Sequence, residues 1–448
     1  MREKAVVIGG GIAGKLAAKA LSHFFQQVTI VEADQEYKEK VPRKRVPQSD
    51  HPHVLLKRGE EAIEMLFPEI VSQLIEDGSI VTNFTKDLKW HHFGYWKKRF
   101  SGEFTMVQQS RPMLEWHLQR RVEEVPHITT RYETKTEQLL VSKHDHTVRG
   151  VRIRSLKTGL TEELDASFVV DASGSASKSI DWLQALDVKV KEEKVKIQLF
   201  YATRLYSLKK QEYPEWQNLL ISPSFPDNPY GAYIQTLEEN RFSVTFSGYA
   251  NAHAPQTDEA FISYAKKLPV PDVLQFLEGA EPLSDIKIHR VPYQLRRRFD
   301  QAKNIPEGFI IIGDAHCRFD PLFGQGISVA AVQALELQSS LFQTKRTDKG
   351  FGERFHKKIS RVIDVPWEMA TTEALRHPDI KGERTFVQPY KQWYCKRVYE
   401  LSASDPEIYI RLVRVMNLIR GPLHLFHPKV LFPIITNKRQ KDGTMMDI

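Results

Sequence analysis

Apolar residues near the start of the chain switch from a strand pattern to a helical pattern. Residues 4–8 are mostly Val, Ile and Ala, and three consecutive glycines follow at 9–11. Residues 12–25 are rich in alanine, with apolar side chains at helical spacing, and residues 28–32 predict a second strand. The order of strand, glycine turn, helix and strand predicts a βαβ unit that opens a parallel sheet.

A different pattern fills the middle of the chain. Apolar and polar residues alternate over 195–199 and again over 242–246, which predicts antiparallel strands with one buried face. Rings and turn glycines over 88–104 predict short antiparallel strands, while 111–122 predicts a helix. Residues 147–155 and 163–171 predict two further strands. The alternating region is therefore expected to form a sheet distinct from the opening fold.

The pattern of the first fold returns near residue 309. Residues 309–312 are apolar throughout, as in a strand of a parallel sheet, and the loop 313–326 leads into a small-residue helix at 327–341. From residue 350 onward, aromatic, leucine and basic residues at helical spacing predict a helical C-terminal region.

Composition limits the class of protein and its partners. The 448 residues are 41% apolar and 27% charged, as in a globular protein of two or three domains, and the net charge of +8 gives weak evidence for nucleic acid, which is not expected as a partner. Cys317 and Cys395 are too few for a disulfide framework, so a cytoplasmic protein is expected. No run approaches the roughly 18 to 20 apolar residues that cross a bilayer, so membrane contact is at most peripheral. The histidines form no ligand set, and no metal site is expected.

Three glycines carry the first candidate binding site. Gly9, Gly11 and Gly14 form G-x-G-x-x-G between a strand and a helix, where the backbone can approach a pyrophosphate and the helix N-terminus faces its charge. Glu32 ends the second strand, where a carboxylate accepts the ribose hydroxyls and repels a 2′-phosphate. The sequence therefore predicts binding of FAD or NAD.

Two later motifs distinguish FAD from NAD. The second covers residues 171–177. The third places G-D-A at 313–315, after an apolar strand, and then Pro321, Gly324 and Gly326 ahead of a helix. Together with the opening glycines, these motifs make the chain resemble the FAD-dependent hydroxylase and epoxidase superfamily, which has the para-hydroxybenzoate hydroxylase type of fold.

The resemblance assigns roles to residues of the third motif. It implies that Asp314, which follows Gly313, accepts hydrogen bonds from the ribityl chain, because a carboxylate is a good acceptor for vicinal hydroxyls. It also implies that the loop containing Pro321, Gly324 and Gly326 brings backbone N–H groups and a helix N-terminus to the pyrimidine edge of the flavin.

Two arginines and the second motif complete the implied cofactor residues. Arg43 and Arg111 match positions whose guanidinium groups meet the flavin or its pyrophosphate. In the second motif the family usually has Asp-Gly, whereas here Ser173 precedes Gly174 and the aspartate, Asp171, lies two residues earlier. Asp171 and Gly174 are kept as cofactor-binding candidates, although this motif departs from the form that makes the usual contact with FAD and nicotinamide.

These observations predict an α/β protein in three interleaved parts. A discontinuous, Rossmann-like FAD-binding domain is expected over 1–85, 105–185 and 285–345. An antiparallel β-sheet substrate domain is expected over 86–104 and 190–284, and a helical C-terminal region over 350–435. The flavin is expected between the first two parts.

The resemblance implies an FAD-dependent monooxygenase. The runs V-P-Q-x-x-H-x-H-V-L-L-x-R-G at 46–59 and C-x-F-x-P-x-x-G-Q-G at 317–326 are similar to bacterial monooxygenases related to polyketide and polyene epoxidases. A flavin C4a-hydroperoxide would then hydroxylate or epoxidise a hydrophobic arene or alkene of polyketide or isoprenoid type. Such oxygen transfer needs chiefly orientation and a dry pocket, and no catalytic residue is assigned.

The sequence leaves other functions and the source of electrons open. One alternative is an FAD-dependent reductase of isoprenoid double bonds. A flavin-dependent halogenase is disfavoured because no W-x-W-x-I-P run is present, and a non-catalytic lipid-binding carrier is disfavoured because the flavin loops are complete. We find one dinucleotide fingerprint, so NADH or NADPH is expected as a transient donor, either directly or through a separate flavin reductase.

Overall fold

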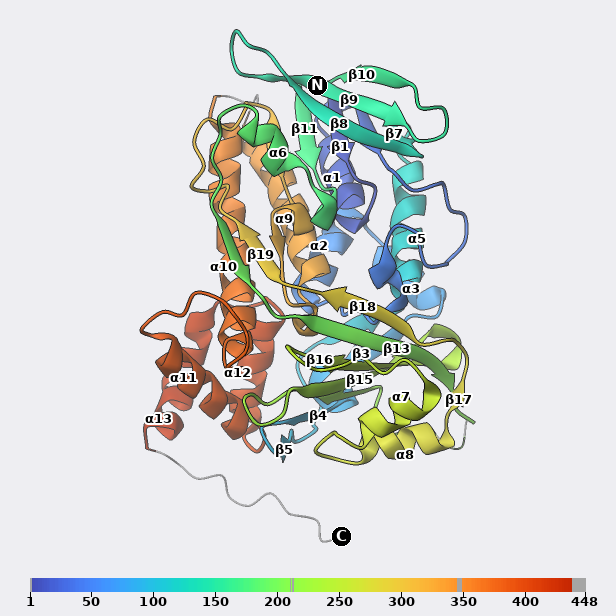
Figure 1. Cartoon of the computed structure of the whole chain (residues 1–448), viewed down its shortest axis with the longest axis vertical. Helices are drawn as coiled ribbons and strands as arrows, with labels where there is room; N and C mark the ends of the chain where they lie inside the picture. Colours follow the sequence, from blue (N-terminus) through green and yellow to red (C-terminus); the bar gives the residue numbers. More distant parts are fainter. Residues whose placement is uncertain (1, 210, 212, 345–348, 437–448) are drawn as a thin grey trace.

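Five parallel strands form the sheet at whose edge the motifs lie. Their order is β20-β11-β1-β2-β7, and every neighbouring pair is parallel. The strands are β1 (Arg2–Ile8), β2 (Phe25–Val31), β7 (Ile128–Arg131), β11 (Phe168–Asp171) and β20 (Phe309–Ile311). In this computed structural model, which describes residues 2–209, 211, 213–344 and 349–436, the parallel sheet lies in the upper half of Figure 1.

The two faces of the parallel sheet have different covers, because successive side chains of a strand point to opposite sides. Ala5 and Val7 of β1 face a helical layer, whereas Val6 and Ile8 face a second sheet. The helical layer contains α1 (Ile12–Ser22), α2 (Lys57–Leu66), α3 (Ile70–Glu76), α5 (Arg111–Glu123) and α9 (Gly326–Gln343). The second sheet consists of β8 (Thr134–Val141), β9 (Val148–Ser155) and β10 (Thr161–Asp165).

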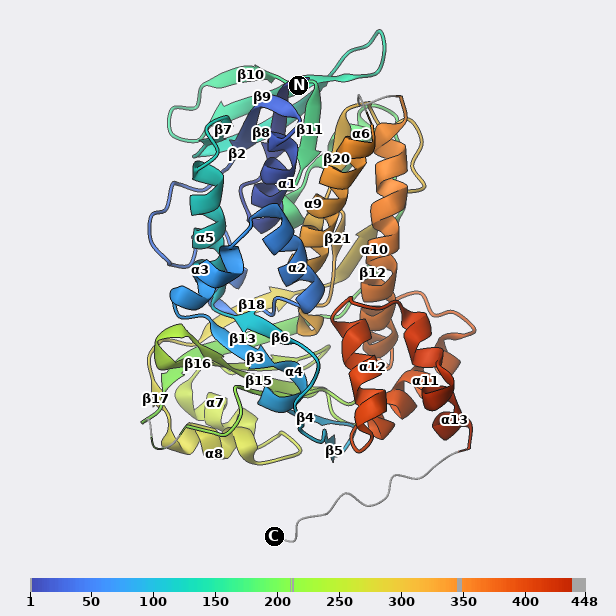
Figure 2. The ribbon, with the colours of Figure 1, turned by 180° about the vertical axis from the view of Figure 1, so that it is seen from behind.

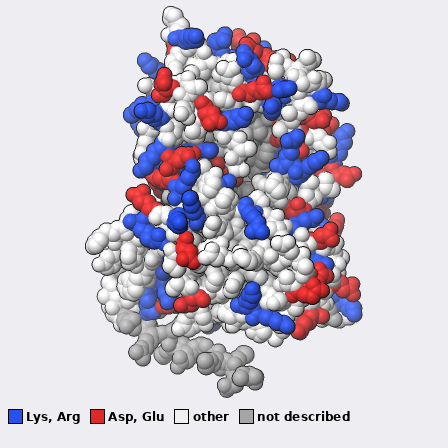
Figure 3. Space-filling view, viewed as in Figure 1, with Lys and Arg blue, Asp and Glu red and all other residues white. Residues whose placement is uncertain are grey.

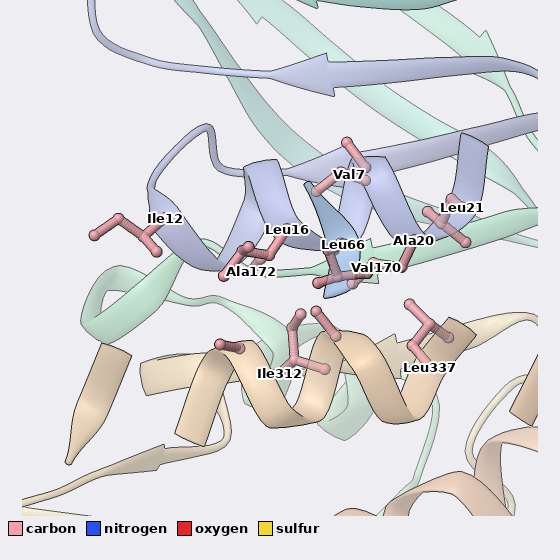
Figure 4. Packing of buried hydrophobic residues seen from close by; sticks show 14 of the residues in the cluster. Val7, Ile12, Leu16, Ala20, Leu21, Leu66, Val170, Ala172, Ile312 and Leu337 are labelled. Atoms are coloured by element: carbon pink, nitrogen blue, oxygen red, sulfur yellow. The ribbon is translucent and has the colours of Figure 1, made fainter. Parts of the chain in front are cut away.

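Close packing of α1 on α9 joins the two ends of the FAD-binding region. Figure 4 shows Leu16 and Leu21 of α1 facing the helix that carries Leu337, with Ile312 from the end of β20 beside them. These residues lie in one buried cluster although more than 290 positions separate Leu21 from Ile312. Burial of such aliphatic side chains contributes about 1.5 to 3 kcal/mol each, so this contact fixes the two motif-bearing loops side by side.

An eight-stranded sheet forms the lower half of the molecule in Figure 1. Its main order is β17 (Glu281–Pro282), β13 (Leu199–Ser207), β16 (Arg241–Gly248), β15 (Tyr230–Leu237), β14 (Asn218–Ile221), β4 (Leu88–His92) and β5 (Tyr95–Trp96), and β18 (Lys287–Val291) pairs with β13. Helices α7 (Asp258–Ala265) and α8 (Asp272–Gly279) cover one face, where Phe200 and Phe246 are fully buried. The opposite face of this sheet points toward the parallel sheet and its helical layer.

Short elements connect these layers. A three-stranded sheet of β12 (Glu192–Val195), β19 (Gln294–Arg297) and β21 (Cys317–Arg318) links the two domains, and β3 (Ile80–Asn83) pairs with β6 (Thr105–Gln108). The short helices α4 (Phe84–Asp87) and α6 (Ser179–Gln184) complete the core of the chain.

The C-terminal region is helical. It consists of α10 (Phe351–Ala374), α11 (Gln388–Leu401), α12 (Pro406–Met416), the 3-10 helix η7 (Pro422–Phe426) and α13 (Pro428–Ile435). Helix α10 packs on the first domain through Phe355 and Ile359, while α11 to α13 pack on Trp90 of β4. In the described part of the chain no helix combines the length and the apolarity that crossing a membrane requires.

The structure confirms the expected fold class, with differences in detail. Residues 163–171 were expected as one strand, but they belong to β10 and β11, because the chain leaves one sheet after Asp165 and enters another at Phe168. The range 285–345 expected for the FAD-binding domain begins with β18, which pairs with β13 in the eight-stranded sheet. Positions 1, 210, 212 and 345 of the expected domain ranges lie outside the described residues.

Candidate functional site

The motif-bearing loops meet at the carboxyl edge of the parallel sheet. Strands β1, β11 and β20 end there, and a Cβ built on Gly9 would lie 2.7 Å from the Ala172 carbonyl oxygen. A Cβ on Gly313 would lie 3.0 Å from the Cβ of Ala13. Three segments that are far apart in the sequence therefore form one site, at the position where open α/β sheets bind ligands.

The glycine loop leaves the N-terminus of α1 free to bind an anion. Gly9 has φ +95°, and a Cβ on Gly14 would lie 1.8 Å from the Gly9 carbonyl oxygen, so both positions require glycine. A Cβ on Gly11 would meet nothing within 4 Å. Gly11 caps α1 without a side-chain hydrogen bond, and the first turn contains no acidic residue. Its N–H groups thus suit a pyrophosphate.

Glu32 lies where the ribose of a dinucleotide would be bound. Its Oε2 accepts the Gly10 N–H at 2.6 Å, and its Oε1 accepts the Asp34 N–H at 2.7 Å. Both hydrogen bonds hold the carboxylate against the glycine loop. Oε2 also lies 3.0 Å from Arg43 Nη2, whereas Oε1 keeps a further lone pair for a ribose hydroxyl.

Both predicted arginines belong to one buried ionic network, and Glu115 joins them. Arg43 approaches Glu32 at 3.0 Å and Glu115 at 3.2 Å, while Arg111 Nε donates to Glu115 Oε1 at 2.8 Å. Burial opposes ionisation of Glu115, but Arg111, Lys15 and Arg43 together lower its pKa to about 2. Glu115 is therefore a carboxylate at neutral pH. The sequence analysis missed it, although its i,i+4 spacing from Arg111 on α5 was visible.

Lys15 is a second residue that the sequence analysis missed. Its side chain is fully buried, its Nζ donates to the Gly10 carbonyl at 2.6 Å, and it lies over the Tyr37 ring. Burial lowers the pKa of Lys15 to about 8, an effect that Glu115 opposes. A lysine inside an alanine-rich helix was the available signal. It adds a positive charge beside the glycine loop.

Asp171 is occupied by its own loop. It is fully buried, accepts the Ser173 N–H at 2.9 Å and the Ser177 hydroxyl at 2.6 Å, and also accepts the hydroxyls of Ser173 and Ser179. Gly174 follows with φ +73° and open space around it. The serines that replace the usual motif thus saturate the carboxylate, and a contact of Asp171 or Gly174 with FAD stays a prediction.

Asp314 lies beside the N-terminus of α9. A Cβ on Gly326 would be 3.8 Å from Asp314 Oδ1, and the Gly313 N–H is held by Gln333 Oε1 at 2.7 Å. Burial raises the pKa of Asp314, while Arg111 and Arg318 act in the opposite direction. No hydrogen bond to the Asp314 carboxylate is formed within the described part of the chain. This partly buried acceptor lacks a partner that a ribityl hydroxyl could supply.

The loop before α9 contains a tight turn that ends at a glycine in the left-handed conformation. Pro321 begins a 3-10 turn, and Gly324 ends it with φ +62°. Asp320 Oδ1 accepts the Leu322 N–H at 3.0 Å, which fixes the turn. Gln325 precedes Gly326 and provides no side-chain cap for α9, so a second helix N-terminus is open at this edge.

The eight-stranded sheet meets this site through polar residues. His51 Nδ1 lies 2.7 Å from the Thr203 hydroxyl, and Gln235 Nε2 donates to the His53 carbonyl at 3.2 Å. His53 Nε2 in turn lies 2.9 Å from Arg111 Nη1. The segment that contains His51 and His53 therefore lies between the eight-stranded sheet and Arg111 of α5.

Because successive side chains of a strand point to opposite faces, the aromatic rings of the eight-stranded sheet lie on two different faces. Phe200 and Phe246 belong to the core under α7 and α8, whereas Tyr233 lies on the other face and donates to Asn218 at 2.9 Å. Two of these three rings are therefore core residues. Among the described residues, no group of three His, Cys, Asp or Glu side chains is arranged to hold a metal ion.

Comparisons with known proteins agree with this geometry. The family model described as the FAD binding domain matches residues 2–350. Protein Rv3254 of Mycobacterium tuberculosis (strain ATCC 25618 / H37Rv) is 28% identical over 404 residues, which cover 88% of this chain and 83% of that protein.

Solved structures are similar in fold at low sequence identity. The flavin-dependent brominase Bmp2 has a TM-score of 0.66 at 14% identity, covering 92% of both chains. The flavin-dependent halogenase CmlS has a TM-score of 0.67 at 17% identity, covering 94% of this chain and 78% of that one. PqsL of Pseudomonas aeruginosa, described as a probable FAD-dependent monooxygenase, has a TM-score of 0.62 at 17% identity, covering 84% of this chain and 98% of that one.

Proposed function

The chain belongs to the FAD-binding domain family, whose model matches residues 2–350, and on that premise we propose that it is an FAD-dependent monooxygenase. The proposed reaction transfers one oxygen atom of dioxygen to a hydrophobic arene or alkene, by hydroxylation or epoxidation. FAD bound at the carboxyl edge of the parallel sheet would supply the redox chemistry and the activation of dioxygen. The chain's own residues bind the cofactor, orient the substrate and exclude water.

The proposal rests on one hydrogen bond between the eight-stranded sheet and the loop before α9. Tyr249, which directly follows β16, donates its hydroxyl to Asp320 Oδ2 at 2.7 Å. Asp320 belongs to the turn that precedes α9, where the resemblance places the flavin ring. A ligand on this face of the sheet would therefore lie next to the reactive end of the cofactor, which is the arrangement that oxygen transfer requires.

The surroundings of this contact favour an apolar substrate. Tyr249 belongs to a buried cluster with Leu199, Tyr201, Phe225 and Val291, against which Leu322 of the same turn packs. A substrate replacing part of this packing would be bound by dispersion and by loss of water contact. Dry walls also keep water away from a reactive oxygen species.

Cofactor binding is assigned to groups at the two helix N-termini. The uncapped N–H groups of α1 would bind the pyrophosphate, Glu32 the ribose, and Asp314 the ribityl chain. Arg43 and Arg111 hold positive charge near this path, although both are engaged by Glu115. Electrons are proposed to come from NADH or NADPH, either by transient docking or through a flavin reductase.

Isotope incorporation tests the proposal. The purified protein is loaded with FAD, reduced chemically without oxygen, and then mixed with 18O2 and a panel of apolar arenes and alkenes. We expect one 18O atom in a product. The variant Tyr249→Phe should keep FAD and still be reoxidised by oxygen, but form less product per flavin. Tyr264→Phe is the matched control, because its hydroxyl donates to Ser247 on the helix-covered side.

Other outcomes would select other functions. Saturation of a double bond by the reduced protein without oxygen would favour an isoprenoid reductase. Product formation that requires chloride or bromide would favour a halogenase, the activity named for two of the similar structures. Failure of the refolded or purified chain to bind FAD would contradict the whole assignment.

A further inference from the structure

The helices at the end of the chain expose an unusual number of large apolar side chains. Of the nineteen exposed large hydrophobic residues in the described chain, eight lie between positions 386 and 435. We call them the C-terminal aromatic surface: Phe386, Val387, Tyr390, Trp393, Leu423, Phe426, Phe432 and Ile435. Phe386 is 88% exposed, Leu423 81% and Phe432 70%. Scattered exposed apolar residues are normal, but a gathered set marks an interaction surface.

The elements that carry these side chains, α11, η7 and α13, pack against one another. The Phe386 and Tyr390 rings are 6.3 Å apart, and the Tyr394 ring stacks on Phe426 at 4.8 Å. The Tyr394 hydroxyl also donates to the Leu425 carbonyl at 2.7 Å, which fixes η7 against α11. Trp393 lies next to Tyr394, with ring centroids 6.4 Å apart.

The same elements already have a buried apolar side, so the outer residues are not needed for folding. In α13, Val430 and Ile434 are buried in the cluster around Trp90, whereas Phe432 and Ile435 point outward. In α11, Val398 and Leu401 are buried, whereas Tyr390 and Trp393 are exposed. The apolar residues on the outward face are therefore not explained by packing within the chain.

The segment that carries this surface has more basic than acidic residues. Residues 376–436 contain ten Lys and Arg but five Asp and Glu. Arg384 donates to the carbonyls of Leu375, His377 and Ile380, and within the described residues neither Arg384 nor Arg420 forms an ion pair with a carboxylate. In Figure 3 blue and red atoms alternate over most of the visible face, whereas the bulge at the lower left, where Figure 1 shows α11 and α13, is mostly white.

We propose that the C-terminal aromatic surface docks on an anionic phospholipid bilayer. Aromatic and leucine side chains that reach into the headgroup boundary, with Lys and Arg around them, are the composition that binds a membrane interface without crossing it. Charge complementarity favours this occupant over a second copy of the chain, because two copies would bring their basic residues together. The proposal is independent of the reaction that the flavin site catalyses.

Vesicle sedimentation with the full-length, FAD-loaded chain tests the proposal. Vesicles of phosphatidylcholine with phosphatidylglycerol should carry the protein down at low salt. Pure phosphatidylcholine and added salt should both weaken binding. The triple variant Phe386→Ser, Leu423→Ser, Phe432→Ser should lose at least tenfold in binding. Arg384→Gln and Arg420→Gln should each lose about fivefold, as expected from about 1 kcal/mol per basic residue near such a surface.

A matched triple variant controls for general loss of surface apolarity. Met65, Leu160 and Leu283 are also exposed but lie outside the C-terminal region, so replacing them by Ser should leave vesicle binding unchanged. Flavin content and circular dichroism should show that both triple variants are folded. Loss of vesicle binding by the control variant, equal to the loss in the Phe386, Leu423 and Phe432 variant, would overturn the proposal.

Two further results would also overturn it. The first is equal vesicle binding by the parent and by the Phe386, Leu423 and Phe432 variant. The second is a concentration-dependent dimer in sedimentation velocity that this variant abolishes, without vesicle binding by the parent. That result would assign the surface to a second copy of the chain.

Discussion

A Cβ on Gly14 would lie 1.8 Å from the carbonyl oxygen of Gly9, so α1 rests on the end of β1 through bare backbone. The replacement Gly14→Ala must push the helix away from the strand. We expect it to destabilise the apoprotein by about 1 to 3 kcal/mol, as overpacking does, and to lower FAD retention as a consequence. Chemical denaturation of the apoprotein and the flavin-to-protein ratio of the purified variant measure these effects.

The neighbouring glycine provides a control that separates folding from binding. A Cβ on Gly11 would meet no protein atom within 4 Å, and its φ of −71° suits any residue. Gly11→Ala should therefore change the stability of the apoprotein by less than about 1 kcal/mol. Its new methyl group would lie at the N-terminus of α1, where the pyrophosphate must approach, so FAD affinity should fall at least tenfold. Equal FAD affinity of Gly11→Ala and the parent would contradict the placement of the cofactor.

A second prediction concerns Asp314, the partly buried carboxylate that receives no hydrogen bond within the described part of the chain. Asp314→Asn removes a charge that burial disfavours, so the apoprotein should be as stable as the parent or more stable. The loss of a charged acceptor should weaken FAD binding about ten- to hundredfold, the equivalent of roughly 1.5 to 3 kcal/mol. Fluorescence titration of the apoprotein with FAD measures this. Asp181→Asn, at an exposed position of α6, should bind FAD as the parent does.

Periodicity predicted the strand and helix types but not every boundary. The opening βαβ unit and α9 were predictable because local spacing and glycines define them. The single strand expected over 163–171 was wrong, because Leu164 and Phe168 are both apolar and conceal the change of sheet between them. Alternation also identified the strands of the larger sheet. It could not say that Phe200 faces α7 and α8, because period two identifies two faces without naming their neighbours.

The residues of the candidate site that belong to a sequence motif could be selected from the sequence. The glycines, Glu32 and Asp314 lie at the ends of parallel strands, and that position follows from the strand order itself. Glu115 and Lys15 could not be selected in this way. Their importance depends on contacts with Arg43 and Gly10, which come from other elements, and a charged residue on a helix is usually exposed.

A third prediction follows from the position of Glu115 between two arginines. Glu115→Gln removes the carboxylate that Arg43 and Arg111 share, while Arg43 keeps Glu32 at 3.0 Å, so the apoprotein should lose roughly 1.5 to 3 kcal/mol of stability, the range for a hydrogen bond to a charged group. Glu124→Gln is the matched control, because Glu124 lies at the C-terminal end of the same helix, α5. Its pairing with Arg121 is exposed, and its loss should cost less than about 1 kcal/mol. Similar effects of the two replacements in urea denaturation would show that the buried network does not stabilise the fold.

The last prediction concerns pH and His51. Burial lowers the pKa of His51 from its ordinary value of 6.5 to about 4, and His289 beside it acts in the same direction. Between these two values the unfolded chain binds a proton that the folded chain does not bind. Stability therefore falls as pH falls from about 6.5 toward 4, and His51 accounts for roughly 1.4 kcal/mol per pH unit once the pH is well inside this window.

His51→Gln removes this titration while keeping a group that can bond to Thr203, so its stability should depend less steeply on pH across the window. Urea denaturation of the apoprotein at pH 7, 6 and 5 gives the two slopes. Buried histidines that do not interact with His51, such as His356, contribute equally to parent and variant and cancel in the difference. His144→Gln, at an exposed position between β8 and β9, should leave the slope of the parent unchanged. Parallel slopes for His51→Gln and the parent would mean that His51 takes up its proton equally in the folded and unfolded chain. Burial between the eight-stranded sheet and the segment around His53 would then not keep His51 neutral.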